Sequence, residues 1–307
     1  MSSAPVLRAG RDSDAAGFID LIATCWAEYP GCVMDLDGEV PELRALATYY
    51  AKQNGALWAA EQDGRVVGMV ATKPLGGGRW ELCKMYAYAD QRGTGLAQSL
   101  VAAAEAHARA NGASEMRLWS DTRFDRAHRF YEKGSYLRDG PIRALNDLSN
   151  SMEFEFAKPL TGTHVQRLDA AAAVSALPRL SRLTAAPWKA IASQAATGAA
   201  MLLVSWHEGT LVGTAVLETP DTQPHRAELN TLFVAPAARQ QGIGRALLRA
   251  TEAAAREAGR ALLTATTGSA EALFLAESWQ RLGSIPGYTR TADGTLEAAT
   301  FLWKPLT

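Results

Sequence analysis

The sequence predicts an α/β (α+β) protein made of two tandem domains, each with a mixed, mostly antiparallel central sheet flanked by helices. The main observation is a repeat, because residues 81–87 and 92–97 recur as residues 228–234 and 239–244 at a constant offset of 147 positions. Copies of this length indicate duplicated domains rather than a solenoid. The 307 residues suit two domains of ordinary size. A hairpin pattern near the start of each copy argues against a doubly wound sheet.

The first copy opens with a short strand at 6–8 and a helix that carries Phe18, Ile22 and Trp26 at helical spacing. The Gln62-Asp63-Gly64 turn joins two strand patterns and is a hairpin signal. A long helix follows the 92–97 turn and ends at Asn111, before Gly112. The remaining expected elements are strands at 56–61, 65–73, 80–87, 116–120 and 151–158 and helices at 41–52 and 124–133.

The stretch 159–163, which contains Pro and Gly, is the natural linker. We therefore expect domains at 1–159 and 164–307. The second copy repeats the order of elements, with an Ala-rich first helix at 170–176 and a long helix at 244–258 that stops before Gly259.

Composition limits the function classes. Hydrophobic residues make up 48% and charged residues 21%, and the net charge is −1 without a long basic run, which disfavours a nucleic-acid or anionic-membrane partner. The three cysteines form no CxxC pair, so we expect neither a disulfide framework nor a metal site. The N-terminus lacks a secretory pattern, and the longest uncharged stretch, 190–206, is too short to span a membrane. The expectation is a cytoplasmic protein.

Each copy places a glycine-containing turn, residues 92–97 and 239–244, between an apolar strand and a long helix. Glycines let successive backbone N–H groups converge on an anion, and the helix adds its free N–H groups and positive dipole end. A diphosphate is the expected ligand, and a ligand-free helix cap is the alternative. The third glycine of a Rossmann fingerprint is missing, since Gln98 and Leu247 take that position, and no Walker A loop is present.

The pattern Arg-x-x-Gly-x-Gly/Ala after a strand such as Glu-Leu-x-x-Leu-Phe-Val resembles the coenzyme A loop of the GNAT superfamily of acyl-CoA N-acyltransferases. The resemblance covers both halves and implies a tandem GNAT-like protein that uses acetyl-CoA, whose acyl arm lies between splayed strands at 80–87 and 116–120. Segments 223–228 and 285–288 are similar to tabtoxin-resistance-type acetyltransferases. The resemblance assigns cofactor binding to Met85, Tyr86, Ala87, Arg92, Gly93, Thr94, Gly95, Leu96, Ala97, Leu232, Phe233, Val234, Arg239, Gln240, Gln241, Gly242, Ile243 and Gly244.

Acetyl transfer to an amine needs a base, because an alkylammonium is mostly protonated at neutral pH. Glu81, at the head of its strand, is the candidate base, and Glu228 is its copy; a solvated strand-end carboxylate is the alternative. Backbone N–H groups near Met85 would hold the thioester oxygen. The segment 127–131 resembles the family motif whose tyrosine, here Tyr131, faces the coenzyme A sulfur, whereas the second copy has Phe274. Catalysis is therefore assigned to the first copy, and an aromatic packing residue is the alternative reading of Tyr131.

The segment between the first two helices often lines the acceptor site in this family. Here it contains Tyr29, Asp35, Asp37 and Glu39, which would suit a cationic amine, although a solvated acidic loop is the favoured interpretation. His128 lies one helical turn before Tyr131 and is expected at the surface.

Three hypotheses remain open. The favoured one is an N-acetyltransferase that acts on a primary amine of a small molecule. In the second, the second copy is the active one, on an amino-acid-like antibiotic or metabolite. The third is a non-catalytic acyl-CoA sensor. The two copies could pack as an internal pseudo-dimer, so that a monomer suffices, or the chain could form a homodimer.

Overall fold

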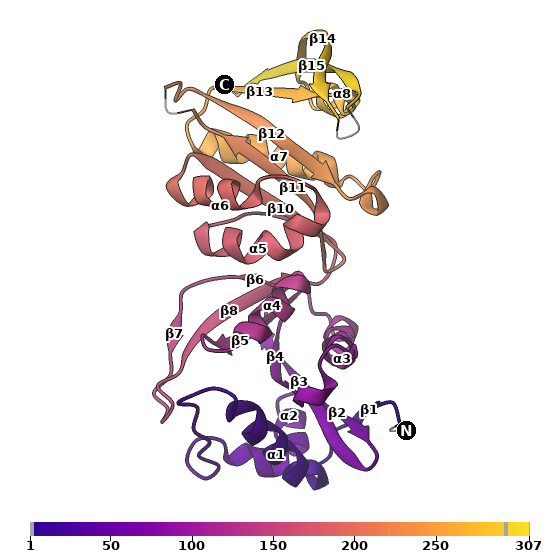
Figure 1. Cartoon of the computed structure of the whole chain (residues 1–307), viewed down its shortest axis with the longest axis vertical. Helices are drawn as coiled ribbons and strands as arrows, with labels where there is room; N and C mark the ends of the chain where they lie inside the picture. Colours follow the sequence, from indigo (N-terminus) through magenta and orange to yellow (C-terminus); the bar gives the residue numbers. More distant parts are fainter. Residues whose placement is uncertain (1–2, 221, 292–293, 307) are drawn as a thin grey trace. The chain divides into compact units, whose positions relative to one another are not determined.

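The structure is a computed structural model that describes residues 3–220, 222–291 and 294–306. It contains two compact units, unit 1 at Met1–Thr161 and unit 2 at Gly162–Thr307 (Figure 1). The boundary between them falls inside the segment 159–163 that the sequence marks as a linker. None of the described helices is both long and apolar enough to cross a membrane.

Unit 1 is built on one mixed sheet in the order β1-β2-β3-β4-β5-β8-β6, with β7 paired to β8. All neighbouring strands are antiparallel except β4 and β5, which are parallel. The elements are β1 (Val6–Ala9), α1 (Ala15–Trp26), η2 (Pro41–Ala45), α2 (Leu46–Ala51), β2 (Ala56–Gln62), β3 (Arg65–Gly76), β4 (Arg79–Ala87), α3 (Leu96–Ala110), β5 (Glu115–Asp121), α4 (Asp125–Lys133), β6 (Leu137–Arg138), β7 (Arg143–Ala144) and β8 (Met152–Pro159), with short 3-10 turns η1 (Asp12–Asp14) and η3 (Ala89–Gln91).

The core of unit 1 lies where α1 and α3 pack on β3 and β4. Phe18 of α1 and Leu100 of α3 are completely buried, and so is Met69 of β3. Helix α3 buries one stripe of apolar side chains, as the helical spacing of these residues requires. Strand β3 lies in the middle of the sheet, and its residues 66–71 are all buried.

Strands β4 and β5 separate soon after they begin. Their parallel pairing covers only Arg79–Glu81 against Glu115–Arg117, and the later residues of β4 have no partner on that side. A β-bulge in β4 adds to the distortion, since Lys84 takes a left-handed conformation with φ 48°. The backbone N–H and C=O groups of this part of β4 are therefore available to a ligand.

Unit 2 repeats the plan with a sheet in the order β14-β15-β13-β12-β11-β10-β9. Its one parallel pair among the described strands, β12 with β13, also ends early, at Leu229 opposite Ala265. The elements are β9 (Thr163–Arg167), α5 (Ala170–Leu183), α6 (Trp188–Thr197), β10 (Ala200–His207), β11 (Thr210–Glu218), β12 (Arg226–Val234), η4 (Pro236–Ala238), α7 (Ile243–Glu257), β13 (Leu262–Thr267), α8 (Glu271–Ala276), β14 (Gln280–Arg290) and β15 (Leu296–Pro305).

The predicted fold class is confirmed, because each unit has a mixed, mostly antiparallel sheet flanked by helices. Most element ends differ from the expectation by one or two residues, which is ordinary fraying. Three differences are larger. Strand β3 continues to Gly76 rather than ending at Lys73. The segment 41–52 is a 3-10 turn followed by a short α-helix, and helix α5 continues through Pro178 to Leu183 rather than ending at Ala176.

Candidate active site

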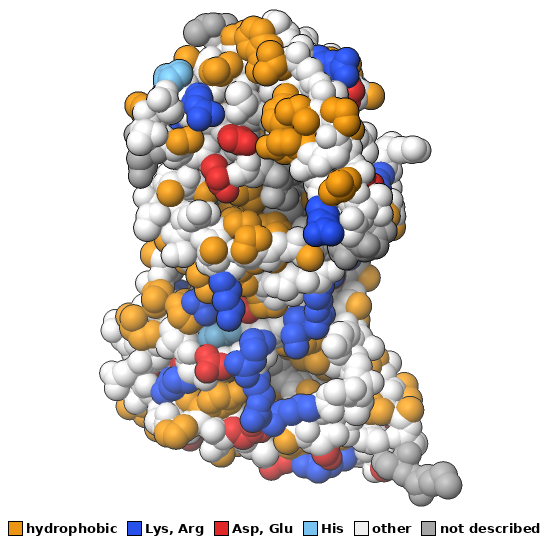
Figure 2. Space-filling view, turned by 45° about the horizontal axis from the view of Figure 1, so that its top comes forward, with side chains coloured by type: hydrophobic (Ala, Val, Ile, Leu, Met, Phe, Trp, Pro, Cys, Tyr) orange, Lys and Arg blue, Asp and Glu red, His pale blue; other side chains and the backbone are white. Residues whose placement is uncertain are grey.

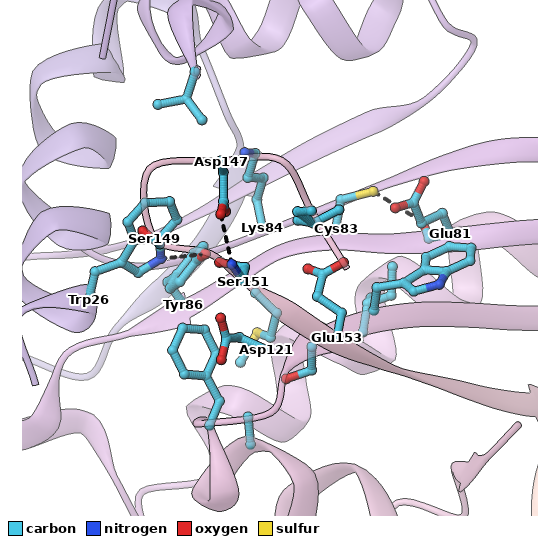
Figure 3. A pocket seen from close by; sticks show the side chains of 18 of the residues that line it. Trp26, Glu81, Cys83, Lys84, Tyr86, Asp121, Asp147, Ser149, Ser151 and Glu153 are labelled. Carbon is cyan, nitrogen blue, oxygen red and sulfur yellow. Dashed lines mark hydrogen bonds between the residues drawn. The ribbon is translucent and has the colours of Figure 1, made fainter. Parts of the chain in front are cut away.

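Two cavities adjoin the splayed strands of unit 1. One has a volume of about 450 Å³ and borders the glycine turn, and we call it the donor cavity. The other has a volume of about 410 Å³ and lies on the side of β7 and β8, and we call it the acceptor cavity (Figure 3). Six residues line both cavities, namely Trp26, Met85, Tyr86, Phe124, Ala127 and Tyr131. A ligand in one cavity can therefore reach a ligand in the other at this junction.

The glycine turn of unit 1 has the shape that an anion site needs. Gly93 and Gly95 both have positive φ, at 78° and 92°, and Gly95 directly precedes α3. Thr94 does not line the donor cavity, since its hydroxyl donates to the Gln91 carbonyl at 2.8 Å. Leu96 also lies outside it, buried in the core. The predicted cofactor residues that do line the donor cavity are Met85, Tyr86, Ala87, Arg92, Gly93, Gly95 and Ala97.

Basic side chains that the sequence analysis missed surround the donor cavity. Arg126, Arg129 and Lys133, all on α4, line it together with Arg92. Glu28 holds two of these cations, because its carboxylate accepts from Arg92 at 2.5 and 2.7 Å and from Arg126 at 3.2 Å. Figure 2 shows a group of Lys and Arg side chains on the visible face of unit 1, in the lower half of the view. Helical spacing within 126–133 was the signal for this cationic face.

Tyr131 lies at the junction of the two cavities. It is only 7% exposed, and its hydroxyl has no hydrogen-bond partner among the residues that the structure describes. Its ring packs on Tyr136 and Phe156, with centroids 5.9 and 6.0 Å apart. Burial raises the pKa of this hydroxyl well above its ordinary value, and the nearby Tyr86 and Cys83 add to the shift. The group therefore stays protonated at neutral pH.

Glu81 lies in the acceptor cavity, at the end of the β4–β5 pairing. Its carboxylate is 3.4 Å from the Lys73 ammonium of the neighbouring strand, and the side chain is 20% exposed. It is therefore neither a freely solvated strand-end group nor fully buried. Lys73 lines the same cavity, and Figure 3 shows Glu81 beside Cys83.

Aromatic side chains and two long connections enclose the acceptor cavity. Trp26 of α1 donates from its indole N–H to the Tyr86 hydroxyl at 2.9 Å (Figure 3). The connection before η2 meets the connection between β7 and β8, because the Val33 N–H donates to the Ser149 hydroxyl at 2.8 Å. These segments are far apart in the sequence, and only the folded sheet brings them together.

The residues of the acidic segment between the first two helices lie in different places. Glu39 lines the acceptor cavity, whereas Asp35 and Asp37 do not. The Asp35 carboxylate accepts the Gly38 N–H at 2.9 Å, and Asp37 pairs with Arg44 at 2.6 Å. Tyr29 lines the donor cavity instead, with its ring 4.5 Å from that of Phe124. One of the four suggested acceptor residues is thus placed in the acceptor cavity.

Two further groups fix the end of β5 and the start of α4. Asp121 is 6% exposed; burial acts to raise its pKa, but hydrogen bonds from Arg123 outweigh this and lower it. The surface position expected for His128 is wrong, because the ring is 3% exposed and its Nε2 lies 2.9 Å from the Asp121 carbonyl. Burial, followed by the charge of Arg138, lowers the pKa of His128. A neutral ring therefore joins α4 to β5.

Unit 2 preserves the backbone of the turn. Gln240 and Gly242 have φ of 62° and 79°, close to the values of Gly93 and Gly95. The Arg239 guanidinium donates back to the Val234 carbonyl at 3.1 Å. Ile243 is a core residue. Four other predicted cofactor residues of this unit lie on or next to the turn and the splayed end of β12, namely Leu232, Phe233, Gln241 and Gly244.

The short helices that follow differ between the units. Phe274 of α8 stands where unit 1 has Tyr131, and it is 2% exposed, with its ring centroid 4.9 Å from that of Trp279. The positions that correspond to Arg126, Arg129 and Lys133 are Ser269, Ala272 and Ala276. Unit 2 thus has the turn, but neither the hydroxyl nor the cationic helix face.

Comparison with known proteins finds a family match in both units. The model of the acetyltransferase (GNAT) family matches residues 18–135 and again residues 172–283. Similar solved structures include the ribosomal-protein-S18-alanine N-acetyltransferase from Escherichia coli, with 21% identity over 47% of this chain and 94% of that chain and a TM-score of 0.40. An acetyltransferase from Streptococcus agalactiae has 20% identity over 52% of this chain and 99% of that chain, with a TM-score of 0.45. A putative acetyltransferase from Salmonella typhimurium, solved with its cofactor acetyl-CoA, has 18% identity over 48% and 95% and a TM-score of 0.41.

Proposed function

The chain belongs to the GNAT family of acetyltransferases, once in each unit, and on this basis we propose that unit 1 transfers an acetyl group from acetyl-CoA to a primary amine of a small molecule. The observation that carries the proposal is the junction of two cavities at Tyr131. A transferase that works by direct attack needs its two substrates to meet at one point, and this junction provides it.

The donor cavity fits a coenzyme A diphosphate. The turn at Gly93 and Gly95 leaves backbone N–H groups free at the start of α3, and Arg92 stands beside it with the cations of α4. We assign Arg126, Arg129 and Lys133 to the phosphate groups in addition to the residues of the turn. When bound, acetyl-CoA supplies an acetyl group activated as a thioester.

We assign the base to Glu81, which accepts a proton from the acceptor ammonium directly or through water. The backbone N–H groups of Met85 and Tyr86, next to the bulge in β4, hydrogen-bond the thioester oxygen as negative charge develops on it. The acceptor nitrogen loses two protons in all as the new C–N bond forms and the C–S bond breaks. One proton passes through Glu81 to solvent, and the other neutralises the sulfur.

Tyr131 then acts as a hydrogen-bond donor to the departing sulfur. Because its pKa is raised, complete proton transfer from the phenol to the thiolate is unfavourable, and the second proton reaches the sulfur from the acceptor nitrogen or solvent. A neutral hydroxyl without another partner is suited to this role, since it loses no existing hydrogen bond when the sulfur arrives.

Unit 2 is assigned a non-transferring role, as a coenzyme A binder or a structural partner of unit 1. A matched pair of variants tests this assignment, Glu81→Gln in unit 1 and Glu228→Gln in unit 2. Thiol release is measured with purified full chain, acetyl-CoA and a panel of small primary amines. We expect Glu81→Gln to lower kcat by on the order of 10²-fold or more and Glu228→Gln to leave it unchanged. The opposite pattern would assign the activity to unit 2, and calorimetric binding of acetyl-CoA without thiol release from any amine would favour a sensor.

A further inference from the structure

We propose that the acceptor carries a second cationic group besides the amine that is acetylated, and that Glu39 and Asp147 of the acceptor cavity bind this second group. The acceptor class is then a small diamine or polyamine. This inference rests on the proposed function, because it names the substrate class of the same site.

The acceptor cavity has an excess of negative charge. Its lining contains three more carboxylates than cations. The carboxylates are Glu39, Glu42, Glu81, Asp121, Asp147 and Glu153, and the cations are Lys73, Lys84 and Arg143. A partly enclosed site of one sign favours a ligand of the opposite sign, and more strongly when that ligand carries two charges.

Most of these carboxylates already have a basic partner. The pairs are Glu42–Lys84 at 3.2 Å, Glu81–Lys73 at 3.4 Å, Asp121–Arg123 at 2.5 Å and Glu153–Arg143 at 2.7 Å. Among the described residues, Glu39 and Asp147 have no basic group within 4.0 Å. Asp147 attracts Arg123 at longer range, but neither carboxylate is in an ion pair, so both can contact a ligand cation directly.

Glu39 and Asp147 are nevertheless held in place. The Glu39 carboxylate accepts the Leu148 N–H at 2.6 Å, and the Asp147 carboxylate accepts the Ser151 N–H at 2.7 Å. These bonds orient the carboxylates without neutralising them. Figure 3 shows Asp147 on the connection that borders the cavity, with Glu81 on another part of the wall.

The Tyr131 hydroxyl points to a ligand at the junction where this cavity meets the donor cavity. It is more than nine-tenths buried, lines the cavity and has no partner among the described residues. It marks the end where the reacting amine lies, whereas Glu39 and Asp147 belong to the two connections. The aromatic side chains of Trp26 and Tyr86 also line the cavity and suit the methylene chain and the cations of such an acceptor. The Trp119 ring is already covered by the Arg143 guanidinium, 4.4 Å from its centroid.

Other acceptor classes fit less well. A zwitterion such as an ω-amino acid would bring a carboxylate into a cavity where Lys73 and Lys84 are already paired and negative charge is in excess. A monoamine would leave the charges of Glu39 and Asp147 without a partner.

The experiment compares three acceptors of equal chain length, 1,4-diaminobutane, butylamine and 4-aminobutyrate, by thiol release from acetyl-CoA with the full chain. We expect kcat/KM for the diamine to exceed that for butylamine by about tenfold or more. The double variant Glu39→Gln/Asp147→Asn keeps both hydrogen-bond acceptors and removes both charges. In it we expect the ratio of diamine to butylamine to fall to about one. Asp90→Asn, which removes an exposed charge outside both cavities, should preserve the wild-type ratio.

Equal use of butylamine or 4-aminobutyrate by the wild type, or a ratio that survives in the double variant, would overturn the inference while leaving acetyl transfer intact. If no amine supports thiol release, the proposed function fails. In that case, calorimetry with 1,4-diaminobutane on coenzyme A-saturated protein tests the cation site at Glu39 and Asp147 by itself. Binding that weakens about tenfold in the double variant supports the cation site, and absence of binding overturns it.

Discussion

The two units share a buried polar network that fastens the long helix to the sheet. In unit 1, Glu105 of α3 is 6% exposed and accepts from the Tyr136 hydroxyl at 2.8 Å and from the Lys158 ammonium at 2.7 Å. In unit 2, Glu252 of α7 is 4% exposed. It accepts from the Trp279 indole N–H at 2.8 Å and from the Lys304 ammonium at 2.7 Å.

The same units differ at the helix that borders the donor cavity. Helix α4 of unit 1 presents a hydroxyl and three cations, whereas α8 of unit 2 has Phe274 and small uncharged side chains at the corresponding positions. The comparison shows that the parts that hold the fold together kept their chemistry after duplication. The turn also kept its backbone shape, whereas the helix face beside it lost its hydroxyl and its cations.

The largest expected effect tests the shared network. Glu105→Gln removes the counter-charge of the buried Lys158, and Glu252→Gln removes that of the partly buried Lys304. Removing one partner of a buried ion pair typically costs about 3–5 kcal/mol of stability. Chemical denaturation followed by circular dichroism measures this loss, and each variant should destabilise the unit that contains it by a similar amount. The exposed Asp90→Asn is the control. A loss of unfolding free energy below about 1 kcal/mol in either variant would show that the network does not stabilise both units.

Tyr131→Phe gives unit 1 the ring that unit 2 already has. We expect kcat to fall by on the order of 10²-fold, because the departing sulfur loses its hydrogen-bond donor, with little change in KM for acetyl-CoA. Steady-state thiol release measures both constants. Tyr288→Phe makes the same chemical change at an exposed tyrosine of unit 2 and should leave kcat and KM unchanged. An unchanged kcat would remove the functional distinction between the units.

The cations of α4 give the third test. Replacing Arg126, Arg129 and Lys133 by alanine should raise KM for acetyl-CoA about tenfold and make KM less dependent on salt, since fewer charges then attract the phosphates. KM is measured at several salt concentrations. Lys189→Ala, an exposed cation of unit 2, serves as the control. An unchanged KM would mean that the turn alone binds the donor.

The smallest effect concerns a strained position that the units share. Ser135 and Ser278 have φ of 71° and 64°, in the left-handed region that glycine adopts without strain. Ser278 is exposed, so Ser278→Gly should stabilise unit 2 by about 1 kcal/mol. Denaturant titration measures the change, with Ser278→Ala expected to give no gain. A loss of stability in the glycine variant would contradict the strain argument.

The sequence predicted much of the candidate site. Motif position alone selected Gly93, Gly95, Glu81 and Tyr131 as site residues. Of these, Gly93, Gly95 and Tyr131 line the donor cavity, as a strand–turn–helix unit predicts, and Glu81 does not. The roles of these residues remain predictions. The paired networks were missed, although Glu105 and Glu252 stand at the same offset as the motifs, because an isolated glutamate gives no sign of what will bury it.

The sequence by itself determined the duplication, the fold of each copy, the turn and the Tyr131/Phe274 difference, because these depend on local spacing and repeat. Only the tertiary structure decided which polar groups face a cavity. It placed Glu39, but not Asp35 or Asp37, in the lining of the acceptor cavity, and it brought Val33 into hydrogen-bond contact with Ser149. It also buried Tyr131, which raises the pKa of the hydroxyl. The reason is that a side chain's neighbours come from strand order and from connections distant in sequence. Charge, burial and pKa follow from those neighbours rather than from the residue type.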